Sequence, residues 1–282
     1  MRFWNRSRRV RVVVFGSHSA DWMRALGPTA AVWSGMAEEV AEVVHVRRPG
    51  KRVPLPRIWG RRTVLLPLME DHVASRPQRY ATLAPTPAAL ATLRDKGAFA
   101  AYACTHGLGH LTPPVYPTLD AAIFPCVLKR TDLNGGQGVE VADSRPHAEQ
   151  LLSAEPFVGH SCIFQAFVSV SAEYVAHCVC RDGRLLWHRV YAYERADRAV
   201  IRRPHPVWHT HPASVSGSLL QSLESFLAPL EYSGPCNIDF AIDDGGRAVV
   251  FEINPRLGGS LMRPENLADL RDCLTCIVRN AN

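Results

Sequence analysis

The segment at residues 237–256, NIDFAIDDGGRAVVFEINPR, places charged and amide side chains on strands that are otherwise as apolar as a buried strand. The DDGG run at 243–246 is a strong turn signal between two such strands, so the segment predicts an antiparallel hairpin. A tight turn at the centre of this run pairs Asp239 with Val250. Side chains two residues apart share a strand face, so we expect Asp239 on the face that carries Val250 and Glu252.

Three oxygen-bearing side chains, Asp239, Glu252 and Asn254, are therefore expected to converge. Two carboxylates close together on a half-buried sheet repel each other and lose hydration, unless a cation compensates them. Mg²⁺ prefers oxygen ligands and shares its shell between one or two carboxylates and nucleotide phosphates. Glu252 is placed to bridge two ions, and Arg256 is placed to hold an anionic substrate or a transferring phosphoryl group. The alternative, an ordinary solvated strand face, is disfavoured by the apolar VVFEI run.

Composition excludes several protein classes. The 282 residues are 47% hydrophobic and 21% charged, which is typical of a globular protein of one or two compact units. No apolar run approaches the roughly 20 residues of a membrane helix. The apolar stretch after Arg8 and Arg9 is also too short for an export signal, so we expect a cytoplasmic protein without membrane contact. The net charge of +6 suits anionic substrates, and the sparse aromatics beside the N-terminal arginines disfavour nucleic acid.

Cysteine and histidine usage indicates no metal or disulfide framework. The eight cysteines are scattered, and the CxxC at Cys273 and Cys276 lies in a helical-looking segment, where core packing is the favoured interpretation. A metal site at His205, His209 and His211 is possible in principle but disfavoured, because these residues have no nearby carboxylate or cysteine partner.

The order of elements predicts an α/β unit followed by a larger, strand-rich unit. The GSHS turn after the first strand lacks the GxGxxG spacing, so we predict no dinucleotide site. An antiparallel hairpin is expected at 172–194, with its turn at 181–183. The other expected strands are 10–16, 42–46, 62–68, 124–130, 138–143 and 160–168, and the expected helices are 33–42, 87–104 and 216–230.

A lysine followed by glycines marks a candidate phosphate loop. In VLKRTDLNGGQGVEV, Lys129 ends a strand and precedes Gly135, Gly136 and Gly138, whose backbone N–H groups can approach phosphate oxygens. The order is opposite to that of a P-loop. A glycine-rich turn between two strands explains the segment about as well.

A short extended segment, IFQAFVSVSAEY, is a candidate nucleobase hinge. The backbone between Gln165 and Val168 can offer N–H and C=O groups to an adenine edge, and Glu173 can accept from ribose hydroxyls. By itself the segment is better explained as a plain buried strand.

Taken in order, these segments resemble the ATP-grasp superfamily over roughly residues 87–265. In that family a lysine opens the middle helix, as in the pair Asp95–Lys96, and a second lysine precedes a glycine-rich flap, as in LKRTDLNGGQG. A hinge of the type E-x-(F/Y)-V binds adenine, as in QAFV, where Gln165 replaces the usual glutamate. An aspartate and an ExN motif close the metal site, as in NIDF and FEIN. Only three of the 32 basic residues are lysines, and two of them occupy these positions.

The resemblance implies an α/β (α+β) ATP-grasp fold with a shortened, Rossmann-like N-terminal domain. The implied domains are 1–86 and 87–282, the latter with a flap-bearing lobe at about 120–168 and a metal-binding lobe at about 169–282. The implied cofactors are ATP and Mg²⁺, two ions, with Mn²⁺ able to substitute. The implied nucleotide contacts are Lys96, Lys129, Gly135, Gly136, Gly138, Gln165, Ala166, Val168 and Glu173.

The activity implied is that of a carboxylate–amine ligase that proceeds through an acyl phosphate, with Arg256 and Lys129 as catalytic residues. The partners would be ATP, a small carboxylate and an amine such as an amino acid or peptide, and a homodimer is compatible with the sequence. The alternatives are an ATP-grasp carboxylase, a cyclising ligase and a non-catalytic nucleotide-binding module. Backbone N–H groups of Gly258 and Gly259 are candidates to support the tetrahedral intermediate. Four basic residues are candidates for a substrate-binding loop or, as the alternative, for solvated surface: Arg189, Arg202, Arg203 and His205.

Overall fold

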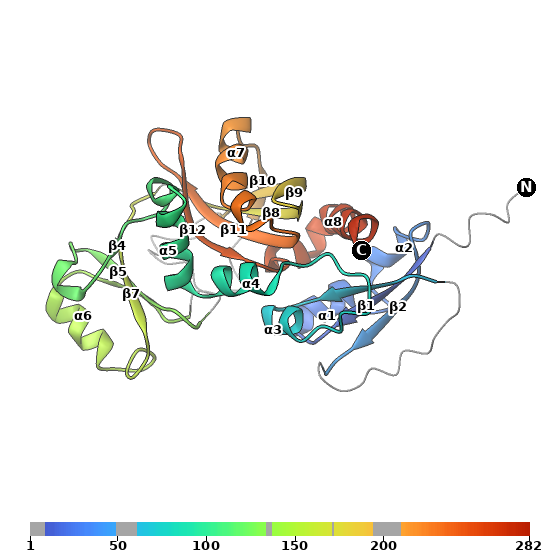
Figure 1. The fold of residues 1–282 in the computed structure, drawn as a ribbon, viewed down its shortest axis with the longest axis horizontal. Helices are drawn as coiled ribbons and strands as arrows, with labels where there is room; N and C mark the ends of the chain where they lie inside the picture. Colours follow the sequence, from blue (N-terminus) through green and yellow to red (C-terminus); the bar gives the residue numbers. More distant parts are fainter. Residues whose placement is uncertain (1–8, 49–60, 134–136, 171, 194–209) are drawn as a thin grey trace, which may run out of the picture.

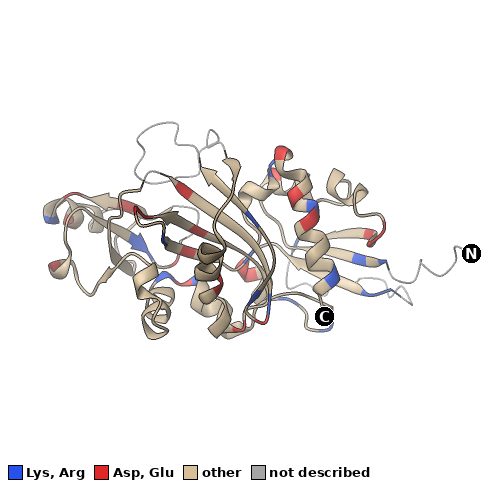
Figure 2. Cartoon of the chain, turned by 90° about the horizontal axis from the view of Figure 1, so that it is seen from above, with Lys and Arg blue, Asp and Glu red and all other residues tan. Residues whose placement is uncertain are grey.

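The computed structural model describes residues 9–48, 61–133, 137–170, 172–193 and 210–282. Three layered parts follow one another along its long axis, with the largest sheet in the middle (Figure 1). Lys and Arg positions are interspersed with Asp and Glu positions along the ribbon (Figure 2). Within the described part of the chain, no helix combines the length and apolar character that crossing a bilayer requires.

The N-terminal part is a three-stranded parallel sheet in the order β2-β1-β3. The central strand is buried along its whole length because both of its faces are covered: Val10, Val12 and Val14 pack into one core and Val13 and Phe15 into another. The strands are β1 (Val10–Phe15), β2 (Val40–Val46) and β3 (Thr63–Pro67), and the helices are α1 (Ala20–Leu26), α2 (Ala31–Ser34) and α3 (Glu70–Ala74).

The predicted helix at 33–42 is wrong. The helix α2 ends at Ser34, turns occupy the residues up to 39, and β2 already begins at Val40. The valine-rich segment pairs in parallel with β1, and this pairing of β-branched residues outweighs the helical spacing of the preceding residues.

The predicted helix at 87–104 is two helices, α4 (Pro87–Arg94) and α5 (Lys96–Thr105). Asp95 between them has an extended backbone, and its carboxylate accepts a hydrogen bond from the Ala98 N–H at 2.7 Å. This N-cap starts a new helix with Lys96 as its first residue.

The next part is a four-stranded antiparallel sheet in the order β4-β7-β5-β6. Its elements are η1 (Gly109–Leu111), β4 (Val115–Tyr116), η2 (Leu119–Ala121), β5 (Cys126–Arg130), β6 (Val139–Ala142), α6 (Arg145–Leu152) and β7 (Cys162–Ala166). The three strands expected at 124–130, 138–143 and 160–168 are confirmed as β5, β6 and β7. The helix α6, which was not among the expected elements, packs against the sheet through Ala148.

The central part is a five-stranded antiparallel sheet in the order β10-β9-β8-β11-β12. The hairpin expected at 172–194 is confirmed, and its turn residues Asp182 and Gly183 both have positive φ. The helix expected at 216–230 ends earlier, at Ser225. The elements are β8 (Glu173–Arg181), β9 (Arg184–Tyr193), β10 (Thr210–Ala213), α7 (Gly217–Ser225), η3 (Ala228–Leu230), β11 (Gly234–Ile242), β12 (Ala248–Asn254), η4 (Gly259–Met262), η5 (Pro264–Asn266) and α8 (Leu267–Asn280).

The large sheet is covered on both faces. One face packs with α4, α5 and α7 around Ile238, Phe240 and Val250. The other contributes Val175 and Tyr191 to a core shared with α8 and the N-terminal sheet. The C-terminal helix therefore joins the N-terminal unit to the central sheet, while the domain boundary at residue 86 stays a prediction.

Candidate nucleotide and metal site

The hairpin β11–β12 contains a bulge that sets which side chains face the site. Asp239 pairs with Glu252, whereas Phe240 pairs with Val250, so Phe251 is an extra residue on β12. The predicted pairing of Asp239 with Val250 is wrong, since the turn has three residues instead of two and the bulge adds another.

The bulge also shows that the sheet face predicted for Val250 is wrong. Val250 is buried in the core on the α7 side together with Phe240, not beside Asp239. Glu252 and Asn254 remain on the opposite face with Asp239, because the extra residue shifts the alternation by one position.

Asp239, Glu252 and Asn254 meet on this face, as the sequence predicted. The Asn254 amide nitrogen donates to Asp239 Oδ2 at 3.3 Å and to Glu252 Oε1 at 3.3 Å. It also lies 3.2 Å from Oδ1 of Asn237, a residue that sequence reasoning did not select. The signal for Asn237 was available, because it precedes Asp239 by two residues and so shares its strand face.

The two carboxylates of this set fit a hard cation, whereas the Asn254 amide presents its NH₂ group to them and its oxygen to Arg256. A single NH₂ group has two hydrogens for three acceptors, and all three distances are at the long end for a hydrogen bond. Among the described residues, no group of three or more His, Cys, Asp or Glu is arranged to hold a metal ion. Two carboxylates and an amide would therefore need further oxygen ligands from a bound substrate, as Mg²⁺ commonly takes them from phosphates.

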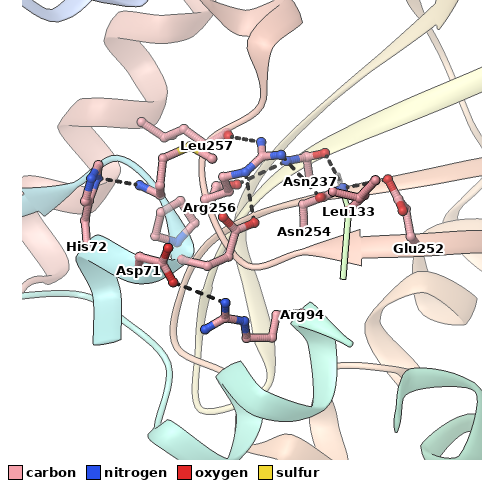
Figure 3. Close-up of polar contacts among 12 residues, drawn as sticks. Asp71, His72, Arg94, Leu133, Asn237, Glu252, Asn254, Arg256 and Leu257 are labelled. Atoms are coloured by element: carbon pink, nitrogen blue, oxygen red, sulfur yellow. Dashed lines mark hydrogen bonds and ion pairs between the residues drawn. The ribbon is translucent and has the colours of Figure 1, made fainter. Parts of the chain in front are cut away.

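Two lysines, Lys96 and Lys129, lie near the carboxylates of this site. Lys96, at the start of α5, donates to the Leu133 carbonyl, and its Nζ lies 3.8 Å from Glu252 Oε2 (Figure 3). Lys129, near the end of β5, has its Nζ 5.8 Å from the centre of the Phe251 ring. Burial lowers the pKa of Lys129 to about 8, and the neighbouring Lys96 acts in the same direction. Nearby carboxylates oppose this shift: Glu252, Glu173 and Asp239.

Arg256 lies beside this cluster and connects it to the N-terminal part. Its Nε donates to Glu70 Oε1 on α3 at 3.0 Å, and both side chains are buried, with 12% and 6% exposed. The two terminal nitrogens donate to the Leu257 carbonyl at 3.0 Å and to Asn254 Oδ1 at 3.3 Å (Figure 3). Sequence reasoning missed Glu70, because nothing in its local pattern indicates a partner 186 residues further along the chain.

A cavity of about 540 Å³ opens next to these residues, between the N-terminal part, α4 and the end of β5. Its charged lining residues are largely paired: Asp71 with Arg94 at 3.1 Å, and Asp132 with Arg130 at 2.7 Å. Its lining residues are Ser17, Met69, Glu70, Asp71, His72, Ala91, Arg94, Asp95, Thr131 and Asp132.

The predicted hinge is the end of β7 and the residues after it. The Gln165 amide is buried and donates to the Pro113 carbonyl at 3.1 Å. The Ala166 N–H donates to the Pro114 carbonyl, so a nucleobase contact from Ala166 would use its C=O group. Val168 follows β7, and Glu173 begins β8.

The glycine loop is described in part. Gly138 has φ +61°, and an added Cβ would lie 3.0 Å from side-chain atoms of Arg130 and Leu133, which explains the glycine. Gly135 and Gly136 lie outside the described residues.

The other candidates separate into three groups. Arg189 pairs with Asp269 on α8 at 2.7 Å. Arg202, Arg203, His205 and His209 lie outside the described residues, and His211 lies in β10. The core-packing interpretation of the CxxC is confirmed for Cys273, which is fully buried in α8 and whose pKa burial raises well above its ordinary value.

Comparisons with known proteins agree with this architecture. No protein-family model matches the chain. A curated relative, the arginine-specific carbamoyl phosphate synthase large chain of Bacillus subtilis, is 26% identical over 137 residues, or 47% of this chain and 13% of that much longer protein.

Solved structures of ligases are among those that match over nearly the whole chain. D-alanine–D-alanine ligase from Bacillus anthracis, complexed with ATP, has a TM-score of 0.63 at 15% identity and covers 96% of each chain. L-amino acid ligase from Bacillus licheniformis has a TM-score of 0.61 at 14% identity and covers 98% of this chain and 75% of that one. The chain therefore has the fold of the ATP-grasp superfamily, which its motifs predicted.

Proposed function

We propose that this protein is an ATP-dependent carboxylate–amine ligase that releases ADP and phosphate. The observation that carries the proposal is the meeting of Asp239, Glu252 and Asn254 near two half-buried lysines, Lys96 and Lys129. Oxygen ligands and point charges in this arrangement suit a metal–triphosphate substrate. The ATP complex of the structurally similar D-alanine–D-alanine ligase and the similarity to an L-amino acid ligase support it.

The lysines and the hinge would hold the nucleotide. Lys96 and Lys129 neutralise phosphate charge, and the backbone after Gln165 receives the adenine. Mg²⁺ ions, or Mn²⁺ in their place, would be held by Asp239, Glu252 and Asn254 and would supply charge neutralisation at the phosphates.

Arg256 would orient the carboxylate substrate. A guanidinium has five N–H groups, and three of those of Arg256 donate within the protein, so each terminal nitrogen keeps one for an anion. A carboxylate oxygen held there attacks the γ-phosphorus, the bond to the ADP oxygen breaks, and an acyl phosphate forms. The amine nitrogen then attacks the acyl carbon, loses a proton and expels phosphate, which leaves an amide.

The cavity beside Glu70, the ion-pair partner of Arg256, would admit the organic substrates. Its volume of about 540 Å³ suits a compact molecule such as an amino acid or a short peptide.

An isotope experiment tests the proposal directly. The protein is incubated with ATP, Mg²⁺, an amine and each member of a panel of carboxylates, including amino acids labelled with ¹⁸O in the carboxyl group. An acyl phosphate intermediate transfers one ¹⁸O atom into the released phosphate, which mass spectrometry detects. Tight ATP binding without ADP release from any pair would instead identify a nucleotide-binding module, and turnover with bicarbonate alone would identify a carboxylase.

A further inference from the structure

A row of four polar side chains crosses the central sheet beneath the segment that follows β12. Arg189 pairs with His177, His177 with Asn237, and Asn237 with Asn254, on four successive strands. Directly opposed residues share a sheet face, so the row runs from the candidate metal ligand Asn254 towards α8. Its far end is tied to that helix by the Arg189–Asp269 ion pair.

The segment 255–260 lies on this row and is bound to it at two points. His177 Nε2 lies 2.7 Å from Ser260 Oγ, and Asn237 Nδ2 donates to the Arg256 carbonyl at 3.3 Å. From the other side, Asn266 donates to the Ser260 carbonyl at 2.8 Å. The segment that contains Arg256 is thus held at both ends.

Gly258 shows how closely the segment approaches the row. An added Cβ would lie 2.3 Å from His177 Cε1 and 3.1 Å from Asn237 Cβ. The backbone of Gly258 has φ −102° and ψ 149°, which any residue can adopt. The glycine is therefore required by contact with the imidazole ring and not by an unusual backbone conformation.

His177 is an expensive residue to bury unless its polar atoms are used. It is 1% exposed, and its neighbours on the same face of β8, Val175 and Val179, are apolar. An aliphatic residue at this position would fill the core but could not hold Ser260, so the imidazole has a function that packing alone does not require.

We propose that His177 is a positioning residue for the segment Arg256–Gly259. Its ring supports Gly258, and its hydrogen bond to Ser260 holds the end of the segment, so that the Arg256 side chain and the Gly258 and Gly259 N–H groups reach the reacting carboxyl group. The inference rests on the proposed ligase function for its kinetic consequences, whereas its structural consequence is independent of that function.

The variants test the contact from both sides. His177→Ala removes the ring and the hydrogen bond, His177→Gln restores a polar group near the Nε2 position, and Ser260→Ala removes the hydrogen-bond partner. Gly258→Ala disturbs the same contact from the segment. Tyr232→Phe is the matched control, because it removes another fully buried hydrogen bond of this sheet, from Tyr232 OH to the Pro235 carbonyl at 2.8 Å, away from the segment.

Three measurements are made on each full-length variant: affinity for AMP-PNP with Mg²⁺, kcat and KM for the carboxylate with the fastest ADP release, and amide hydrogen exchange at 255–260. For His177→Ala and Gly258→Ala we expect kcat to fall roughly 10- to 100-fold, as a misplaced catalytic group predicts, with nucleotide affinity within about twofold of wild type. Amide hydrogen exchange at 255–260 should be faster in these two variants, and His177→Gln should recover part of kcat. The losses of kcat caused by His177→Ala and Ser260→Ala should not be additive.

Each contrary result has a defined meaning. A His177→Ala variant with wild-type kcat and wild-type amide exchange would overturn the proposal. So would a parallel loss of nucleotide affinity and kcat in both His177→Ala and Tyr232→Phe, because that pattern indicates general destabilisation. If His177→Ala does not fold, Gly258→Ala and His177→Gln decide in the same way. If the wild-type protein forms no ADP with any carboxylate, the ligase function fails, and faster exchange at 255–260 in the His177 variants but not in Tyr232→Phe still supports the positioning role.

Discussion

Lys129 is the proposed nucleotide contact whose charge state is most sensitive to pH. Burial lowers its pKa to about 8, so the unliganded protein loses this positive charge as the pH rises through that value. Bound phosphates favour the charged form, and ATP binding above pH 8 must therefore take up a proton. We expect metal-free ATP affinity to be constant below about pH 7.5 and to fall towards tenfold per pH unit above pH 8, as measured by calorimetry in buffers containing EDTA.

Lys129→Arg is the control for this titration, because a guanidinium stays protonated throughout the range. Its ATP affinity is expected to be weaker but to show no decline between pH 8 and 9.5. The same decline in both proteins would assign the titration to another group.

Glu252 is the residue on which the proposed metal site depends most. Its carboxylate faces Asp239, the Asn254 amide and Lys96, so replacing it with glutamine removes a central ligand charge while keeping its size. We expect Glu252→Gln to form no measurable ADP. Its free energy of unfolding, measured by urea denaturation, should lie within about 1 kcal/mol of the wild-type value. The control is Asp244→Asn, which changes an exposed residue in the turn of the same hairpin and should retain activity. Wild-type turnover in Glu252→Gln would show that Glu252 is not a metal ligand.

At the level of elements, the break between α4 and α5 positions Lys96, a proposed phosphate contact. Asp95 caps α5 at 2.7 Å from the Ala98 nitrogen, so Lys96 begins the helix next to Glu252. Asp95→Ala should cost about 1 kcal/mol of stability and also weaken ATP binding, because the first turn of α5 loosens.

The cap of the neighbouring helix gives a matched comparison. Thr86 accepts from the Ala89 nitrogen at 3.2 Å, and Thr86→Ala should lose similar stability while ATP affinity stays unchanged. Asp95→Ser keeps a capping oxygen and should restore both properties. Equal ATP affinity in Asp95→Ala and Thr86→Ala, measured by equilibrium binding, would show that the Asp95 cap has no effect on nucleotide binding.

At the level of the whole molecule, the buried pair between Glu70 and Arg256 joins the N-terminal part to the site. Removing the carboxylate leaves a guanidinium that is only 12% exposed without its acid partner, so Glu70→Ala should destabilise the protein by about 3–5 kcal/mol. Glu70→Gln keeps an acceptor and should cost less. Denaturation curves for Glu70→Ala, Arg256→Ala and the double variant measure the coupling, and additive losses would show that the pair does not hold the parts together.

Several features could be derived from the sequence because they depend on neighbouring residues. The DDGG turn and the alternation on either side of it predict a hairpin with Asp239, Glu252 and Asn254 on one face. The fold itself was implied by the resemblance of the ordered lysine, glycine and ExN segments to the ATP-grasp superfamily. The valine-rich strand β2 was predicted almost in full, whereas the helix before it was not, because pairing with β1 decided where helix ended and strand began.

Tertiary structure alone decided the remaining features of the site. The bulge at Phe251 follows from packing Val250 and Ile253 against the same core, which a period of two cannot encode. The contacts of Glu70 with Arg256 and of His177 with Ser260 join residues 186 and 83 positions apart, and only the folded arrangement of strands and helices brings them within hydrogen-bonding distance. Local sequence patterns specify which groups a segment presents, but the packing of distant segments specifies which groups they meet.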